Sequence, residues 1–180
     1  CRDNNNEVTL LARGERLQQL REHGLVVENW ETGERFEAPV TLIDTLAAND
    51  AYDLVLVLVR KNQVQALLPM LAANRVTPNV LFMVNNAEGY HPLAEALGAE
   101  RVLLGFPGAG GTRQEHVNLY KLVGETQPTT MGEIDGRITP RLKAIAATFE
   151  NAGLPTAFST NMDAWLKTHV ALVSPIANAL

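Results

Sequence analysis

Cysteine is almost absent from this sequence, and histidine is sparse and scattered. The single cysteine, Cys1, cannot form an internal disulfide or build a cysteine-ligated metal site. The four histidines, His23, His91, His116 and His169, lie far apart, and no two of them have the i,i+4 spacing of a helical zinc motif. These absences predict a cytoplasmic protein with no metal centre.

Long hydrophobic runs and an excess of basic charge are also missing. No apolar stretch reaches the roughly 18–20 residues that a membrane-spanning helix needs, and no basic stretch followed by an apolar one resembles a signal peptide. The 15 basic residues are scattered among 20 acidic ones, for a net charge of −5. This charge pattern argues against nucleic acid and anionic membranes as partners.

The composition suits a globular core, with 46% hydrophobic and 19% charged residues. Short apolar runs predict buried parallel strands, and they alternate with stretches whose apolar residues recur at helical spacing. The strand candidates are 8–12, 54–59, 80–84 and 102–104, and the helix candidates are 14–23, 63–73, 92–97 and 141–151. The alternation predicts an α/β protein with a mostly parallel sheet and right-handed crossovers, in which 54–59 is the best central-strand candidate.

Two regions depart from this alternation. Residues 25–28 and 35–38 flank the turn-rich stretch 31–34 and predict an antiparallel hairpin. Loose alternation in 117–123, followed by 130–134, predicts two antiparallel strands added to the edge of the sheet.

The last part of the chain predicts a short strand at 156–159 and then a long, mostly apolar helix. The helix includes Asp163, and either Asn161 or Asp163 can serve as its N-cap. We therefore divide the chain into residues 1–160 and residues 161–180, the second part being the first helix of a helical domain. A boundary there places the helix start beside a cleft between domains, where ligand sites often occur.

Ligands of parallel α/β sheets bind beyond the carboxyl ends of the strands, so the residues after each expected strand are site candidates. Arg13 follows the first strand. It is either a solvated arginine at a helix start or a guanidinium that pairs with the 2'-phosphate of NADP. The position after a strand favours the phosphate interpretation.

Further candidates follow the next two strands. Arg60, Lys61 and Gln63 offer two cations and an amide to an anionic or polar ligand, although strand ends are normally polar. Basic residues at a helix start oppose the macrodipole, which mildly favours a function for them. Asn86 either forms an Asx turn or orients a substrate carbonyl, because its amide both donates and accepts.

Two more features carry alternatives. The glycine-rich segment 105–111, which includes Gly110, lacks the Gly-Lys-Ser/Thr of a nucleotide P-loop, but it allows close backbone approach to a flat group such as a cofactor ring. Lys167 stands two residues after Trp165 in an apolar helix. Its ammonium is either a surface charge or a group placed against a substrate, and this choice decides whether the protein is an enzyme.

In chain order, these landmarks resemble those of the ketopantoate reductase family: VTLLARGE at 8–15, DLVLVLVRKNQ at 53–63, NNAEG at 85–89 and WLK at 165–167. The resemblance runs through nearly the whole chain. It implies a Rossmann-like domain that binds NADPH, followed by a helical domain. It also implies reduction of 2-dehydropantoate to pantoate in pantothenate biosynthesis, or of a related 2-oxo acid.

The resemblance assigns roles to individual residues. Lys167 matches the family's catalytic lysine, Asn86 matches an asparagine of its active site, and Arg13 matches its arginine for the 2'-phosphate. With the other strand-end residues, the expected cofactor-binding set is Arg13, Arg60, Lys61, Gln63, Asn86 and Gly110, and the expected substrate-binding set is Lys167, Ala171 and Ser174. The expected partner is a small 2-oxo acid, and formation of a homodimer is possible.

Several positions depart from the family pattern. Arg60 replaces a lysine, Ala171 replaces a substrate-contacting asparagine, and Ala87 replaces the glycine after Asn86. Loss of that asparagine puts the substrate in question and leaves the NADP expectation intact. An NADP-binding sensor or assembly module without turnover is the alternative that these changes favour.

The family's Gly-x-Gly-x-x-Gly turn, which cradles a pyrophosphate, and most of its helical domain are not found in these 180 residues. We therefore expect the sequence to be an internal piece of a longer protein, incomplete at both ends.

Overall fold

The structure is a computed structural model that describes residues 6–123 and 126–179, with side chains as far as residue 173. Its helices are α1 Gly14–His23, α2 Lys61–Ala73, α3 His91–Leu97, α4 Pro140–Asn151 and α5 Met162–Ala179, with a short 3-10 helix at Ala99–Arg101. Its strands are β1 Thr9–Leu11, β2 Leu25–Asn29, β3 Arg35–Ala38, β4 Thr41–Ile43, β5 Val55–Val57, β6 Val80–Met83, β7 Val102–Phe106, β8 Ala109–Gln114, β9 Val117–Leu122, β10 Thr129–Glu133 and β11 Thr156–Phe158.

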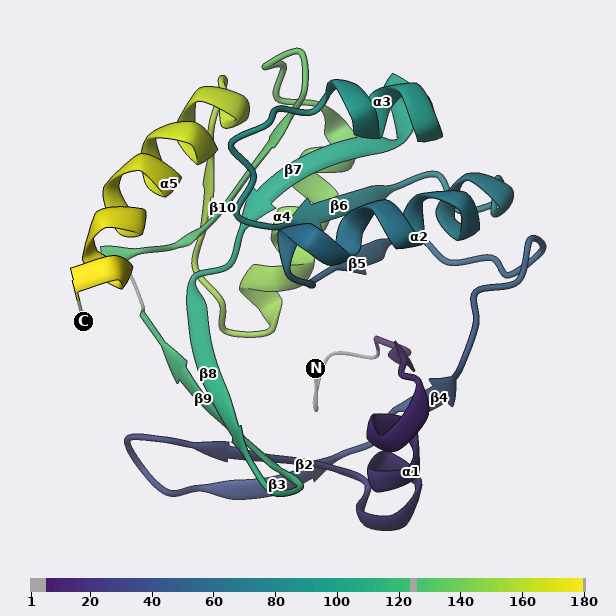
Figure 1. Cartoon of the computed structure of the whole chain (residues 1–180), viewed down its shortest axis with the longest axis vertical. Helices are drawn as coiled ribbons and strands as arrows, with labels where there is room; N and C mark the ends of the chain where they lie inside the picture. Colours follow the sequence, from purple (N-terminus) through teal and green to yellow (C-terminus); the bar gives the residue numbers. More distant parts are fainter. Residues whose placement is uncertain (1–5, 124–125, 180) are drawn as a thin grey trace.

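The largest sheet has the strand order β11-β10-β7-β6-β5. Strands β5, β6 and β7 are parallel, β10 runs antiparallel to β7, and β11 is parallel to β10. Helices α2 and α3 and the start of α5 cover one face, while α4 covers the other (Figure 1). The prediction of an α/β protein with a mostly parallel sheet is confirmed.

Strand β6 shows why this sheet is buried on both sides. Successive side chains of a strand point to opposite faces, so Val80 and Phe82 pack under α2 and α3, whereas Leu81 and Met83 pack against α4. All four are at most 5% exposed. A run of large apolar residues without polar alternation is therefore what a doubly covered strand requires.

Two smaller sheets complete the fold. Strands β1 and β4 pair in parallel beside α1, and their core includes Ala12, Leu17 and Leu20. The predicted hairpin of β2 and β3 is confirmed, and it belongs to a four-stranded sheet with the order β3-β2-β9-β8. Figure 1 shows this sheet projecting away from the largest one.

Three sequence predictions about strands were wrong. Strand β5 is an edge strand among the described residues, because only β6 pairs with it, and Leu56 and Leu58 stay exposed. Strand β9 joins the hairpin sheet rather than the edge of the large one, through its pairing with β2. Strand β10 is antiparallel to β7, as predicted, but it lies inside the large sheet, fully buried between β7 and β11, and not at its edge.

Helix ends follow the capping chemistry of the sequence. The Asn161 side chain accepts a hydrogen bond from the Ala164 backbone N–H at 3.0 Å, so Asn161, not Asp163, caps α5. Met162 and Leu166 on the first turns of α5 are buried in the core shared with α2 and α3.

The division of the chain into residues 1–160 and residues 161–180 stays a prediction. No helix in the described part of the chain has the length and apolarity needed to cross a membrane.

Candidate functional site

The carboxyl ends of β5, β6 and β7 border an open crevice of about 640 Å³. This is the position at which parallel α/β sheets bind ligands. The crevice is lined by Leu58, Val59, Arg60, Lys61, Gln63, Met83, Val84, Asn85, Phe106 and Pro107. The structure therefore brings Arg60, Lys61 and Gln63 together with residues from two further strand ends.

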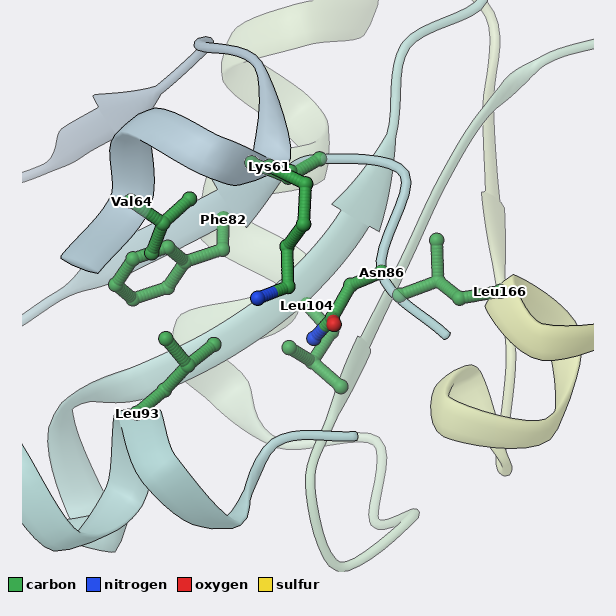
Figure 2. Close-up of a pocket in the computed structure, with 8 residues that line it drawn as sticks. Lys61, Val64, Phe82, Asn86, Leu93, Leu104 and Leu166 are labelled. Atoms are coloured by element: carbon green, nitrogen blue, oxygen red, sulfur yellow. The ribbon is translucent and has the colours of Figure 1, made fainter. Parts of the chain in front are cut away.

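Lys61 and Asn86 line a small, mostly apolar cavity, shown in Figure 2, which shares Lys61 and Val84 with the crevice. Its volume of about 10 Å³ corresponds to a single water. The other lining residues are Val64, Phe82, Val84, Leu93, Leu104 and Leu166. Because Lys61 lines both spaces, its side chain stands at the border between crevice and cavity.

Asn86 forms the Asx turn that was one of its two interpretations. Its Oδ1 accepts from the Glu88 backbone N–H at 3.2 Å, and its Nδ2 donates to the Gly89 carbonyl at 2.7 Å. The side-chain amide has two donor hydrogens and two acceptor lone pairs, so these bonds leave one of each. Asn86 is only 5% exposed, and the turn holds its amide in one orientation.

Lys61 forms an ion pair across the site. Its Nζ lies 2.5 Å from Oε2 of Glu88. Glu88 belongs to the loop between β6 and α3, because α3 begins at His91. The pair joins the start of α2 to the loop that holds Asn86.

Lys167 lies on the other side of the same loop. Its Nζ is 2.5 Å from Oδ2 of Asp163, one turn earlier in α5. A β-carbon built on Gly89 would lie 3.8 Å from this Nζ and 3.5 Å from Asp163 Oδ1. The structure thus places the Lys167 ammonium against the loop of Asn86, with 47% of the side chain exposed.

Three rings form a cluster that the sequence reasoning missed. Phe106 at the end of β7 lies 5.4 Å from Trp165 and 4.1 Å from His169 between ring centroids, and Trp165 stacks on His169. Burial lowers the pKa of His169 below its ordinary value. The i,i+4 spacing of Trp165 and His169 on an expected helix was the signal that could have revealed the pair.

The remaining predicted residues lie elsewhere. Arg13 is outside the crevice, and its guanidinium donates to the Asp44 carbonyl at 3.0 Å and to Met70 Sδ at 3.2 Å. Gly110 lies in β8, and it is not among the residues that line the crevice. Ala171 is exposed on α5, one turn after Lys167. Ser174 also falls in α5, but its side chain lies outside the described residues.

The crevice fits one end of a dinucleotide in its chemistry. Arg60 and Lys61 offer cations to a phosphate, while Val59, Phe106 and Pro107 provide apolar surface for a flat ring. Among residues 6–123 and 126–179, no three His, Cys, Asp or Glu side chains gather in a way that could hold a metal ion. The residues that line the crevice are therefore cations, amides and apolar groups.

A mostly parallel sheet with such a crevice at its strand ends defines a Rossmann-like protein. The sequence model of the family described as ketopantoate reductase PanE/ApbA matches residues 1–136. The chain belongs to the ketopantoate reductase family, whose members are NAD(P)H-dependent oxidoreductases. A comparison with curated proteins finds no match.

Solved structures share this fold. A 2-dehydropantoate 2-reductase from Porphyromonas gingivalis W83 is 20% identical, with a TM-score of 0.75 over 96% of this chain and 60% of its own. A protein of Ralstonia solanacearum MolK2 assigned as a ketopantoate reductase is 25% identical, with a TM-score of 0.73 over 88% of this chain and 54% of its own. D-mandelate dehydrogenase, solved with NADH and anilino(oxo)acetate, is 23% identical, with a TM-score of 0.70 over 88% and 51%. The chain spans about half to three-fifths of the length of these solved proteins.

Proposed function

We propose that the protein reduces a 2-oxo acid to a 2-hydroxy acid with NADPH, and that 2-dehydropantoate is the first substrate to test. The observation that carries the proposal is the position of the Lys167 ammonium against the Asn86–Gly89 loop, beside a strand-end crevice lined by Arg60 and Lys61. Family membership supports an oxidoreductase that uses a nicotinamide cofactor.

Within this proposal, the bound cofactor supplies the hydride that reaches C2 of the substrate. As the C2 carbonyl is reduced, its π electrons move to oxygen, and Lys167 Nζ stabilises the developing charge and donates the proton. Lysine suits both tasks because its ammonium is a compact charge with three donors. Asn86 uses its remaining N–H or lone pair to orient the substrate, since the Asx turn fixes its amide.

The test is NADPH oxidation, followed by absorbance, against a panel of 2-oxo acids that includes 2-dehydropantoate. Lys167→Ala should lower turnover at least about 100-fold while NADPH affinity stays unchanged, because proton transfer by a positioned group contributes about 10²–10⁴-fold. The matched control is Lys143→Ala, an exposed lysine on α4 at the opposite face of the sheet. Undiminished turnover in Lys167→Ala would exclude Lys167 as the proton donor, and absence of NADPH oxidation with every acid of the panel would exclude the reductase function.

A second candidate is an NADP-binding module without turnover. Two observations favour it: Lys167 is engaged by Asp163, and the exposed Ala171 offers no polar group one turn further along α5. NADPH binding without oxidation by any 2-oxo acid of the panel would select this candidate over the reductase.

A further inference from the structure

The ion pair between Lys61 and Glu88 stands at the centre of the candidate site. It bridges the first residue of α2 and the loop after β6, and its lysine borders both the crevice and the cavity that contains Asn86. The 2.5 Å distance between Nζ and Oε2 shows that a carboxylate fits at this ammonium. Glu88 therefore occupies a place that a small carboxylate from solution can take.

We propose that Lys61 binds the carboxylate of the substrate, and that Glu88 is an internal competitor which the substrate displaces. The proposal rests on the proposed reduction of a 2-oxo acid and assigns the group that recognises its acid end. In such a molecule the carboxylate is bonded directly to the reacting carbonyl carbon. Lys61 Nζ contacts Glu88 and Lys167 Nζ lies near Gly89, so two ammonium groups border one short loop, one available to each of these groups.

Displacement of Glu88 is easy because its side chain is 58% exposed. Exposed ion pairs add little stability, and water readily replaces either partner. Lys61 is more enclosed, with 33% of its side chain exposed, and its stem lies among the cavity residues in Figure 2. An incoming carboxylate therefore finds a partly desolvated cation, whereas the released Glu88 returns to solvent.

Lys61 fits this role better than its neighbour Arg60, so in this proposal Arg60 alone offers its cation to a cofactor phosphate and Lys61 takes the substrate instead. Arg60 lines the crevice but not the cavity beside Asn86, whereas Lys61 lines both. Lys167 is held by a residue of its own helix, so its ion pair does not connect separate elements. A ligand that enters between α2 and the loop would break the ion pair of Lys61 with Glu88, but not the ion pair of Lys167 with Asp163.

The experiment measures binding of oxamate, an unreactive analogue of a 2-oxo acid, to the 180-residue chain by NMR. The lysines are labelled by reductive ¹³C-methylation, and the chain has only four, so the Lys61 signal can be assigned with Lys61→Arg. Each titration is repeated with NADP⁺ present, so that a carboxylate that binds only beside the cofactor is also detected. Wild type is compared with Lys61→Ala, in which the Lys167 signal reports binding, and with Glu88→Gln.

Lys61→Ala should raise the Kd for oxamate about tenfold, the loss expected for one charge-assisted hydrogen bond. Glu88→Gln should lower the Kd about two- to fivefold, because the competing carboxylate is removed. If the ion pair were purely structural, Glu88→Gln would instead raise the Kd for oxamate. The matched control is Glu31→Gln, which removes a similarly exposed carboxylate, 2.9 Å from Lys121, and should change nothing.

The proposal is overturned if oxamate leaves the Lys61 signal unmoved, or if Glu88→Gln weakens or does not change binding. These outcomes are separate from those of the proposed function. If oxamate binds with the expected variant pattern but no 2-oxo acid supports NADPH oxidation, the reductase proposal is excluded and the carboxylate site is supported. If Lys61→Ala oxidises NADPH with an unchanged KM for the 2-oxo acid, the reductase proposal is supported and the carboxylate site is excluded.

Discussion

Asp163 Oδ2 lies 2.5 Å from Lys167 Nζ, and both groups lie beside Gly89. Asp163 stands in the first turn of α5, where a negative charge also complements the helix dipole. It limits the orientations open to the lysine and keeps the ammonium beside the loop of Asn86. In the proposed reductase, Asp163 is therefore a positioning residue that acts through Lys167.

Asp163→Asn should lower kcat about tenfold while KM changes less than about twofold, because a loosened ammonium loses the alignment that speeds proton transfer. Asp163→Glu keeps the charge at the i,i+4 spacing and should restore most of the rate. Steady-state kinetics of both variants provides the measurement. Equal kcat in wild type and Asp163→Asn would show that the ion pair only stabilises the helix end.

The stacked rings of Trp165 and His169 predict a pH-dependent fluorescence signal. Their centroids are 5.2 Å apart with an angle of 6° between the planes. Burial lowers the pKa of His169 below its ordinary value of 6.5, so the imidazole stays neutral to lower pH than a solvated histidine. Protonation should then quench Trp165, with a midpoint below pH 6.5.

The measurement uses Trp30→Phe, because Trp30 is the only other tryptophan in the chain. His169→Gln in the same background should abolish the transition. The folded protein disfavours the charged imidazole, so this group contributes stability above pH 6.5 that is lost as the pH falls toward the folded-state pKa. A midpoint above pH 6.5 would contradict the burial effect.

Local patterns predicted the helices and most of the strands, but not β4 or β8. The apolar spacing in α1 and the glycine after it, Gly24 with φ of 70°, defined that helix and its end from the sequence. The strand-end rule also pointed to Arg60, Lys61 and Gln63 after β5, which line the crevice with residues that follow β6 and β7, because the carboxyl ends of parallel strands share one edge.

The failures concern how strands pair, which local patterns do not encode. The run 54–59 has the apolar character of a central strand, yet β5 is at the edge of its sheet in the described chain, and Leu56 is 41% exposed. Strand β9 pairs with β2, about 90 residues earlier, as in the register of Val26 with Val117. Ion pairs such as Lys61 with Glu88 also depend on tertiary positions, so spacing alone could not reveal them.

Two neighbouring glycines of β8 give a matched pair of predictions. A β-carbon on Gly111 would collide with the backbone carbonyl oxygen of Leu119 on the paired strand, whereas one on Gly110 would meet nothing within 4 Å. Gly111→Ala should therefore destabilise the fold by about 1–3 kcal/mol, the usual cost of overpacking. Gly110→Ala should leave the free energy of unfolding within about 0.5 kcal/mol of wild type.

Urea unfolding at pH 7 distinguishes the two variants. The same proteins test the predicted cofactor role of Gly110. If this glycine permits close approach of a cofactor ring, Gly110→Ala should bind NADPH more weakly than wild type. Equal stability losses at the two positions would contradict the steric argument.

The buried carboxylate of Glu133 predicts how the fold responds to acid. Glu133 is 4% exposed, and its two oxygens accept hydrogen bonds from Arg141, at 2.8 Å and 2.5 Å, and from Thr139. Burial by itself would raise the pKa of Glu133, but the hydrogen bonds from Arg141 and Thr139 outweigh it, and the pKa is lowered from 4.5. The ion pair therefore fixes β10 to the start of α4 in its charged form.

A lowered pKa means that the unfolded chain binds a proton more readily than the folded one. The contribution of Glu133 is fully present above pH 4.5, the ordinary value, and is lost as the pH falls through the lower folded-state pKa. Glu133→Gln should cost about 3–5 kcal/mol at pH 7, because it leaves Arg141 without its buried partner. The difference between wild type and variant should shrink as the pH falls below 4.5.

Urea unfolding of wild type and Glu133→Gln at a series of pH values from 7 to about 3 measures this difference directly, since carboxylates paired in the folded state give stability that acid removes. Asp135→Asn provides the control, because it removes the exposed carboxylate that pairs with Arg137 at 2.7 Å and should change stability little at any pH. A stability difference that stayed constant down to pH 3 would show that Glu133 acts through packing and hydrogen-bond geometry rather than through its charge.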